Sequence, residues 1–264
     1  MSDAPIAATW ARLRAARRPG LVTYLTAGFP SYDVSREALQ VADELADVIE
    51  VGVPFSDPLA DGPTIQRSTF QALEAGMTLP RTLELVAETK LSRPVVIFSY
   101  LNPILRYGVE PFLRDAASLG IAGLLLTDLP AGSDAAVEQQ VQQSPLDLIR
   151  LVAPTTRADR LARSVSGAQG FLYLVSRLGV TGASVTLASD LEASIARVRA
   201  ASPLPIAVGF GISTAEQAAR VGRLADGVVV GSALVDRLAT EGVRGVRDLL
   251  SSLRRAVDRT EAAA

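Results

Sequence analysis

Eight short apolar runs, rich in β-branched residues, recur along the chain with helical patterns between them. A strand that is buried on both faces reads as a continuous apolar run, and such strands alternate with helices in parallel sheets. Eight strand–helix units in 264 residues fit a (β/α)₈ barrel, which typically takes about 250 residues. An open doubly wound sheet is the alternative that this pattern leaves open. The predicted strands are Leu21–Thr26, Val48–Val51, Val95–Ser99, Gly123–Leu126, Leu148–Val152, Phe171–Val175, Ile206–Gly209 and Gly227–Val230.

Segments with apolar residues at helical spacing separate these strands. Pro63 suits the first position of a helix, where its missing N–H has no partner in any case. A short amphipathic helix over residues about 5–17 precedes the first strand, and we expect a frayed tail over about 259–264. No linker or second domain is visible, so residues 1–264 are predicted to form a single domain. The predicted helices are Val34–Leu45, Pro63–Ala75, Val109–Leu119, Ser133–Gln142, Arg157–Ser166, Leu191–Ala200, Thr214–Val221 and Val243–Val257.

Three features of the composition limit the chemistry. The chain has no Cys and no His, which excludes disulfides, a thiolate nucleophile, an imidazole base and the commonest metal ligand. Lys90 is its single lysine. Catalysis therefore has to use Asp, Glu, Tyr, hydroxyl, Arg or backbone groups. A metal site built from carboxylates alone stays open, but no spacing indicates one, so no metal is predicted.

The charge and the length of the apolar runs bear on partners and location. The formal net charge is −2, and no basic block is present, which argues against nucleic acid as a partner. The longest apolar runs are far too short to cross a bilayer. The N-terminal segment lacks the apolar core of a signal peptide. We therefore expect a cytoplasmic protein that binds neither nucleic acid nor a membrane.

One stretch, VIEVGVPFSDPLADG, places carboxylates where they are unexpected. Glu50 lies inside a predicted buried strand, and Asp57 and Asp61 follow in a loop bounded by prolines and a glycine. The active site of a barrel lies at the C-terminal ends of its strands, so this loop and the Tyr100–Gly108 segment are predicted to face one site. Other roles stay open, because a buried glutamate can simply shape the interior and loop aspartates can cap turns.

Small residues follow the sixth, seventh and eighth predicted strands. Barrels often bind phosphate at the loops after strands seven and eight, because glycine lets the backbone approach an anion and helix N-termini stabilise it. Gly211, Gly231 and Ser232 lie at those two places, and Thr181 and Gly182 lie in the loop before them. The glycines can also serve tight turns alone. Three adjacent loops of this kind nevertheless indicate a phosphorylated substrate.

Aldolase-type chemistry is a common use of barrels that bind sugar phosphates. The covalent form needs a lysine in the site, but Lys90 precedes the third strand, on the opposite face. The metal-dependent form typically uses histidine ligands, which this chain lacks. A carbon–carbon lyase of this composition thus needs a substrate that supplies its own electron sink. A buried Glu50 suits the acid–base role, because burial raises the pKa of a carboxyl group toward the working pH.

The run IEVGVPFSDPLADGPTIQRS closely resembles the signature of the tryptophan synthase alpha subunit family. This resemblance implies a TIM barrel and a lyase of tryptophan biosynthesis, which cleaves indole-3-glycerol phosphate to indole and glyceraldehyde 3-phosphate. It also implies no cofactor in this chain, and a beta subunit that carries pyridoxal phosphate, receives the indole and completes an α₂β₂ heterotetramer. The resemblance continues in LVTYLTAGFPS at 21–31, SYLNPILRYG at 99–108, LLLTDLP at 124–130, LVAPTT at 151–156, YLVSRLGVTGA at 173–183, VGFGIS at 208–213 and GVVVGSAL at 227–234.

The resemblance also implies a role for each matching residue. Glu50 takes the place of the family's catalytic glutamate, which moves protons at indole C3 and at the glycerol hydroxyl. Asp61 matches the second catalytic carboxylate, which holds the indole N–H. The implied substrate-binding residues are Tyr100, Tyr173, Thr181 and Phe210, and the implied phosphate-binding residues are Gly182, Gly211, Gly231 and Ser232. The implied interface with the beta subunit includes Pro54, Asp57 and Asn102.

Three other functions remain open at this point. A barrel isomerase of phosphorylated sugars would share the phosphate site, although we do not expect the VPFSDPLADG loop in it. A free-standing lyase would release indole with no beta partner. A scaffold that only activates a beta subunit would need neither Glu50 nor Asp61, and the presence of both argues against it.

Overall fold

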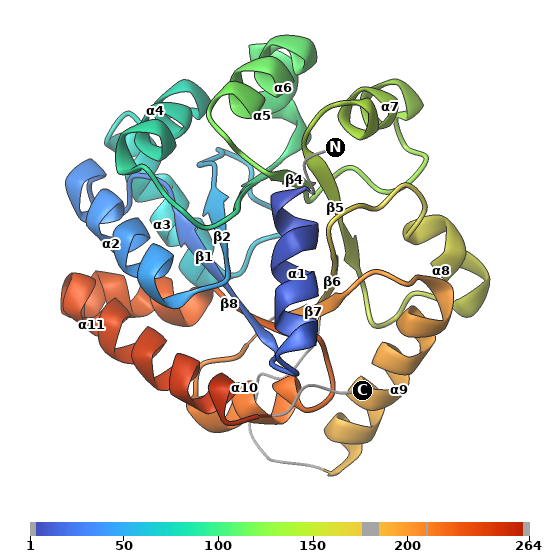
Figure 1. The fold of residues 1–264 in the computed structure, drawn as a ribbon. Helices are drawn as coiled ribbons and strands as arrows, with labels where there is room; N and C mark the ends of the chain where they lie inside the picture. The colour runs from blue at the N-terminus through green and yellow to red at the C-terminus, as the bar shows by residue number, and fades with distance from the viewer. Residues whose placement is uncertain (1–3, 176–184, 210, 261–264) are drawn as a thin grey trace.

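The structure, a computed structural model, describes residues 4–175, 185–209 and 211–260. Its eight parallel strands close into one barrel in chain order, and helices surround them (Figure 1). This arrangement confirms the predicted (β/α)₈ barrel and excludes the open sheet. The strands are β1 Gly20–Thr26, β2 Val48–Gly52, β3 Val95–Ser99, β4 Gly123–Leu126, β5 Asp147–Val152, β6 Leu172–Val175, β7 Ile206–Gly209 and β8 Gly227–Val230.

The helices follow the predicted order, with two additions and two extensions. Helix α4 occupies a stretch for which no element was predicted, and α5 replaces a predicted loop. Helix α9 begins at Val185 rather than at Leu191, and α11 begins at Ser232 rather than at Val243. The N-terminal helix ends at Ala15, two residues before its predicted end. The helices are α1 Pro5–Ala15, α2 Tyr32–Leu45, α3 Pro63–Glu74, α4 Leu79–Thr89, α5 Leu101–Tyr107, α6 Val109–Ser118, α7 Ala135–Gln143, α8 Ala158–Ser164, α9 Val185–Ala201, α10 Ala215–Gly222 and α11 Ser232–Asp258.

Local chemistry explains these differences. The side chain of Thr78 caps the start of α4 by accepting from the Arg81 N–H, a contact that favours a helix start. Pro103 lies in the first turn of α5, where proline is tolerated, although it reads as a loop residue in the sequence. Gly242 has a φ of 66° and breaks the helical geometry inside α11, so only the second half of that helix was predicted.

Helix α1 closes the N-terminal end of the barrel and lies across it in Figure 1. Its buried Ile6, Trp10 and Leu13 pack into a core formed by inward-facing strand residues. The Trp10 ring occupies the space beside Gly227, where a Cβ atom would lie 2.5 Å from a ring carbon. Gly20 makes the same room on β1. Glycines on two neighbouring strands therefore leave the space that the aromatic ring fills.

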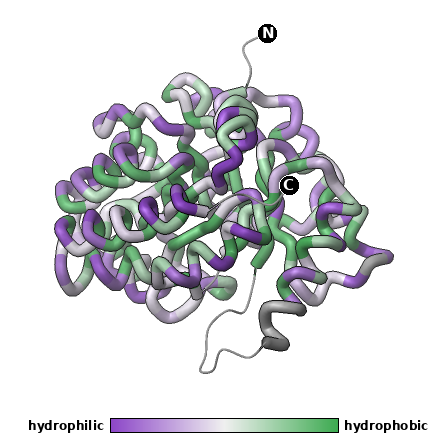
Figure 2. Tube along the Cα trace, turned by 60° about the horizontal axis from the view of Figure 1, so that its bottom comes forward, coloured by the Kyte–Doolittle hydropathy of each residue, from purple (hydrophilic) through white to green (hydrophobic). Residues whose placement is uncertain are grey.

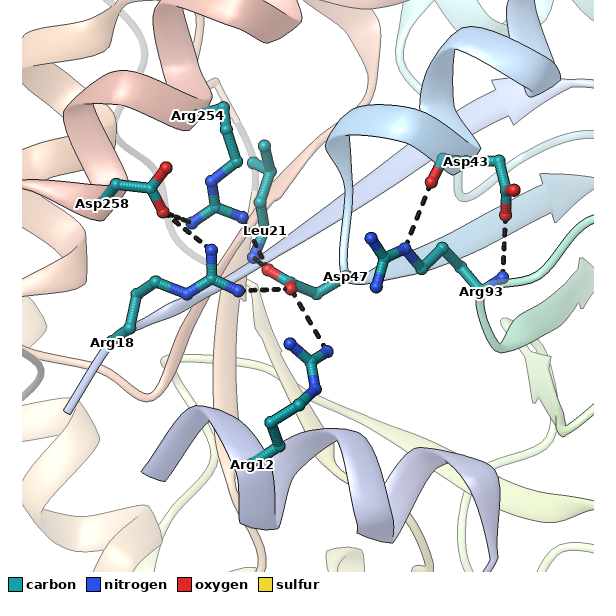
Figure 3. A network of polar contacts seen from close by, with 8 residues as sticks. All are labelled: Arg12, Arg18, Leu21, Asp43, Asp47, Arg93, Arg254 and Asp258. Carbon is teal, nitrogen blue, oxygen red and sulfur yellow. Dashed lines mark hydrogen bonds and ion pairs between the residues drawn. The ribbon is translucent and has the colours of Figure 1, made fainter. Parts of the chain in front are cut away.

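A polar network anchors the same end of the molecule (Figure 3). Asp47, which is buried just before β2, accepts a 2.7 Å hydrogen bond from Arg18 and another of 2.7 Å from Arg254 of α11. It also accepts from the Leu21 N–H at 3.0 Å, and Asp258 contacts both arginines. One carboxylate thus joins the starts of β1 and β2 to the C-terminal part of the chain.

The outer layer has the amphipathic character that a barrel requires. In Figure 2 the helices alternate between hydrophilic and hydrophobic colours along their length, whereas hydrophobic segments lie inside. Between residues 4 and 260, excluding 176–184 and 210, no helix has the length and apolar character needed to cross a membrane. Lys90 is exposed after α4, and β3 begins five residues later, so the lysine precedes the N-terminal end of that strand as predicted.

Candidate active site

A cavity of about 350 Å³ lies at the C-terminal ends of the strands. This volume is in the range of small-molecule sites. Inward-facing residues of the strands form the floor of the cavity, and the loops that follow the strands form its sides. The predicted Glu50, Asp61, Tyr173, Gly211, Gly231 and Ser232 all line it. The other lining residues are Tyr24, Ala60, Gly62, Ile65, Phe98, Thr127, Leu151, Val175, Ile212, Ser213, Val229, Ala233 and Asp236.

Glu50 occupies the middle of β2, in register with Tyr24 of β1 and Val96 of β3. Its side chain is fully buried, and neither carboxyl oxygen has a hydrogen-bond partner among the described residues. Removal from water penalises the charged form, so burial raises the pKa of Glu50 to about 8. The carboxyl group is therefore protonated at neutral pH and able to donate a proton into the cavity.

Asp61 lies in the loop between β2 and α3, with its side chain partly exposed. The Tyr100 hydroxyl donates to Asp61 Oδ2 at 3.2 Å and accepts from the Ala60 N–H at 2.9 Å. Burial raises the pKa of Asp61 to about 6, although the Tyr100 hydrogen bond opposes the shift. Asp61 is thus mainly a carboxylate at neutral pH. One cavity therefore holds a neutral acid and an anion.

Gln66 supports the loop of Asp61 and was missed in the sequence. Its side-chain amide donates to the backbone oxygens of Pro58 at 3.2 Å and of Asp61 at 3.0 Å. The residue lies in the first turn of α3, directly after this loop. A long amide side chain at such a position can reach back to loop carbonyl groups, and this signal was available in the sequence.

Two tyrosines cover the glutamate side of the cavity, Tyr24 on β1 and Tyr173 on β6. A Cβ atom on Gly52 would lie 2.1 Å from the Tyr24 hydroxyl oxygen, and one on Gly209 would lie 2.3 Å from that of Tyr173. Burial, together with the nearby Glu50 and Asp61, raises the pKa of both phenols. Both hydroxyls therefore stay protonated. Tyr24 was missed as a site residue, although its period-two spacing from Val22 places it on the inner face.

The opposite end of the cavity suits an anion. Gly231 precedes α11, and Ser232 is its first residue. The first N–H groups of a helix have no partner within it, and the helix dipole favours negative charge there. Gly211 follows β7 with a φ of 79°, a conformation that glycine adopts without strain. The predicted Thr181, Gly182 and Phe210 lie outside the described residues.

The comparison with known proteins decides the family. The model of the family described as tryptophan synthase alpha chain matches residues 10–263. The chain belongs to the tryptophan synthase alpha chain family. Members of this family are lyases that cleave indole-3-glycerol phosphate to indole and glyceraldehyde 3-phosphate, and this chain is one of them. The result agrees with the resemblance found in the sequence.

Solved structures of tryptophan synthase support the same assignment. The chain is similar to a structure of Mycobacterium tuberculosis tryptophan synthase, at 40% identity and a TM-score of 0.88, over 96% of this chain and 98% of that chain. It is also similar to tryptophan synthase subunit alpha from Legionella pneumophila str. Paris, at 36% identity and a TM-score of 0.89. That match covers 97% of this chain and 99% of the other.

For a tryptophan synthase alpha chain, the surface beside the Asp61 loop is of particular interest. Asp57 and Asn102 are exposed there, whereas Pro54 is buried, so its own side chain offers little surface. Leu59 is 92% exposed and Leu105 is 49% exposed. Asp57 and Leu59 lie in the loop that carries Asp61, and Asn102 and Leu105 lie in α5.

Proposed function

We propose that Glu50 and Asp61 together cleave indole-3-glycerol phosphate by acid–base catalysis, with no cofactor bound to this chain. The observation that carries the proposal is the pairing in one cavity of two carboxyl groups. Glu50 is buried with no hydrogen-bond partner among the described residues, and Asp61 is a partly buried carboxylate. Among the described residues, no group of three or more His, Cys, Asp or Glu side chains is arranged to hold a metal ion. The proposed chemistry uses the carboxyl groups alone.

The phosphate group orients the substrate. We propose that its oxygens accept hydrogen bonds at Gly182, Gly211, Gly231 and Ser232, with the α11 N-terminus stabilising the charge. The indole ring then extends toward the carboxyl groups, and Tyr100, Tyr173, Thr181 and Phe210 help to bind it. The two described tyrosines support this arrangement, because Tyr173 lines the cavity and the Tyr100 hydroxyl donates to Asp61.

The reaction then requires one proton to be given and one to be taken. Protonated Glu50 donates to indole C3, which leaves the ring with an iminium nitrogen. Asp61 accepts the hydrogen bond of that N–H and stabilises the positive charge. Ionised Glu50 next removes the proton of the hydroxyl on the carbon attached to the ring. The carbon–carbon bond breaks, its electron pair returns to the ring, an aldehyde forms, and Glu50 is again protonated.

Two matched substitutions test these roles through indole release by the purified chain. Glu50→Gln keeps the shape of the side chain and removes the proton, so we expect a loss of about 10²–10⁴ in rate. Asp61→Asn removes a preorganised charge, at a cost of about 3–4 kcal/mol in transition-state stabilisation. Asp57→Asn alters an exposed carboxyl of the same loop and is the control. If Asp57→Asn abolishes turnover while Asp61→Asn does not, the two roles are reversed.

We also propose that a beta subunit binds the surface formed by Asp57, Leu59, Asn102 and Leu105. The loop that carries Asp57 and Leu59 also carries Asp61, so contact with a partner would hold the catalytic carboxylate in place. Tyr100 immediately precedes α5, which contains Asn102 and Leu105, and it donates to Asp61. Both segments of this surface thus adjoin the Asp61 hydrogen-bond network. The α₂β₂ stoichiometry, the pyridoxal phosphate of the partner and the cytoplasmic location remain predictions.

The test of this partner is a titration of beta subunit into the chain, with and without an indole-glycerol phosphate analogue. Couplings between two sites are typically about 1–3 kcal/mol and are reciprocal. The analogue should therefore tighten binding of the beta subunit by the factor with which the beta subunit tightens binding of the analogue. Unchanged affinity together with unchanged indole release would favour the free-standing lyase.

A further inference from the structure

The phosphate end of the cavity contains a carboxylate that the proposed mechanism does not use. Asp236 lines the cavity and lies four residues after Ser232 in α11. Residues four apart lie on the same face of a helix, at roughly 5–6 Å between their Cβ atoms. The carboxylate is therefore close to the place where the substrate's phosphate dianion would bind. Its negative charge opposes that binding.

Among the residues that the structure describes, none with a positive side chain lines the cavity. Its described lining includes three carboxyl residues, Glu50, Asp61 and Asp236, and neither Arg nor Lys. Burial keeps Glu50 neutral at pH 7, and Asp61 belongs to the proposed indole end. Asp236 is thus the acidic group that bears most directly on the phosphate.

Helix α3 supplies a positive charge from outside the cavity. Arg67 Nη2 lies 3.2 Å from Asp236 Oδ1, and the Thr64 hydroxyl donates to Asp236 Oδ2 at 3.1 Å. Arg67 also donates to the Thr64 hydroxyl oxygen at 3.4 Å. Both oxygens of Asp236 are therefore occupied by α3. The Arg67 and Asp236 side chains are 72% and 52% exposed, so the pair adds little to folding stability, and its effect is on local charge.

We propose that Arg67 is a positioning residue for substrate binding, which neutralises Asp236 and so permits the phosphate dianion to bind at the start of α11. This inference rests on the proposed phosphate site at Gly231 and Ser232. Without Arg67, one carboxylate repels a dianion over roughly 6–7 Å in a water-like medium, which weakens binding by roughly threefold to tenfold. The effect decreases as salt is added, because salt screens exposed charges.

The experiment measures binding of glycerol 3-phosphate and of indole to the full chain by calorimetry, at low and at high ionic strength. Arg67→Gln should weaken glycerol 3-phosphate by roughly threefold to tenfold at low ionic strength and leave indole unchanged. The double variant Arg67→Gln with Asp236→Asn should recover wild-type affinity, because the charge that needed balancing is gone. The control makes the same substitutions at another ion pair of α11, Arg244 and Asp248. These side chains lie 3.8 Å apart and are not among the described residues that line the cavity.

Distinct outcomes separate this inference from the proposed phosphate site. Equal losses for indole and glycerol 3-phosphate, or no recovery in the double variant, would show a structural role for Arg67 and overturn the inference. An unchanged affinity of Arg67→Gln would overturn it as well, if Gly211→Val still weakens glycerol 3-phosphate. If Gly211→Val also leaves that affinity unchanged, the phosphate site itself is wrong, and the inference is overturned with it.

Discussion

Replacing Glu50 by Gln should stabilise the folded chain at neutral pH while it removes catalysis. The wild-type carboxyl group is ionised in the unfolded chain above a pKa of 4.5 but protonated in the folded chain up to a pKa of about 8. Between these values, folding takes up a proton, and each pH unit costs about 1.4 kcal/mol. At pH 7 the cost is about 3 kcal/mol, whereas at pH 4.5 it nearly vanishes.

Because the pKa of Glu50 is raised in the folded chain, the stability of the folded chain falls as pH rises. Below the unfolded value both states are protonated, and Glu50 imposes no charge penalty. As pH rises through the window up to about 8, stability is lost, and above it the full penalty of a buried anion remains. Glutamine has no charge to bury. The difference in stability between Glu50→Gln and wild type should therefore be small near pH 5 and grow to about 3 kcal/mol at pH 7.

The assay is urea unfolding at a series of pH values, followed by tryptophan fluorescence and by far-UV circular dichroism. Coincident transitions are required before free energies are compared. Glu44→Gln is the control, because Glu44 is exposed and bonds with Arg247, which lowers its pKa. A Glu50→Gln stability difference that is the same at pH 5 and pH 8 would refute the reasoning, since it would show that Glu50 is charged in the folded cavity.

Three further predictions concern catalysis and binding. The profile of kcat/KM against pH should be bell-shaped. It should fall below about pH 6 as Asp61 is protonated and above about pH 8 as Glu50 ionises. Tyr100→Phe removes a hydrogen bond that lowers the Asp61 pKa, so the acidic limb of the profile should move to higher pH. Gly211→Val forces a side chain into a φ of 79° and should weaken glycerol 3-phosphate, measured by calorimetry, much more than indole. Gln66→Leu should lower kcat about tenfold or more in the indole-release assay while leaving glycerol 3-phosphate affinity intact, and equal losses in both would contradict its role at the Asp61 loop.

The sequence was most informative where the barrel repeats itself. Every predicted strand is present, because doubly buried strands must be apolar and short. Glu50 was recognisable for the same reason, since a carboxylate inside such a run violates the pattern. Two of the additional helical segments were hidden by local exceptions: Pro103 read as a loop residue in α5, and Gly242 divided α11 into a predicted and an unpredicted half.

The contacts that complete the site were less visible because they join distant parts of the chain. Arg67 meets Asp236 across 169 positions, and no local pattern in either segment indicates the pair. Tyr24 was overlooked because it reads as an ordinary strand residue; its role depends on Gly52, which leaves room for the hydroxyl. The direction of the Glu50 pKa shift was predictable from burial, whereas only the folded structure shows that its oxygens have no hydrogen-bond partner among the described residues.

The packing of Trp10 against β1 and β8 has a consequence for the order in which the chain folds. Its ring packs beside Gly20 of β1 and Gly227 of β8, which are register partners in the barrel, and lies 5.6 Å from the ring of Phe171. These strands become neighbours only when the last one has closed the ring. Helix α1, which precedes all eight strands in the sequence, should therefore be the last element to dock, since contacts between distant segments form slowly. Trp10 is the only tryptophan in the sequence. Its fluorescence in a refolding experiment should therefore change after most of the helical circular dichroism signal has returned. A fluorescence change in the earliest phase would show that α1 docks on an open sheet. The chain thus carries its own optical reporter of barrel closure.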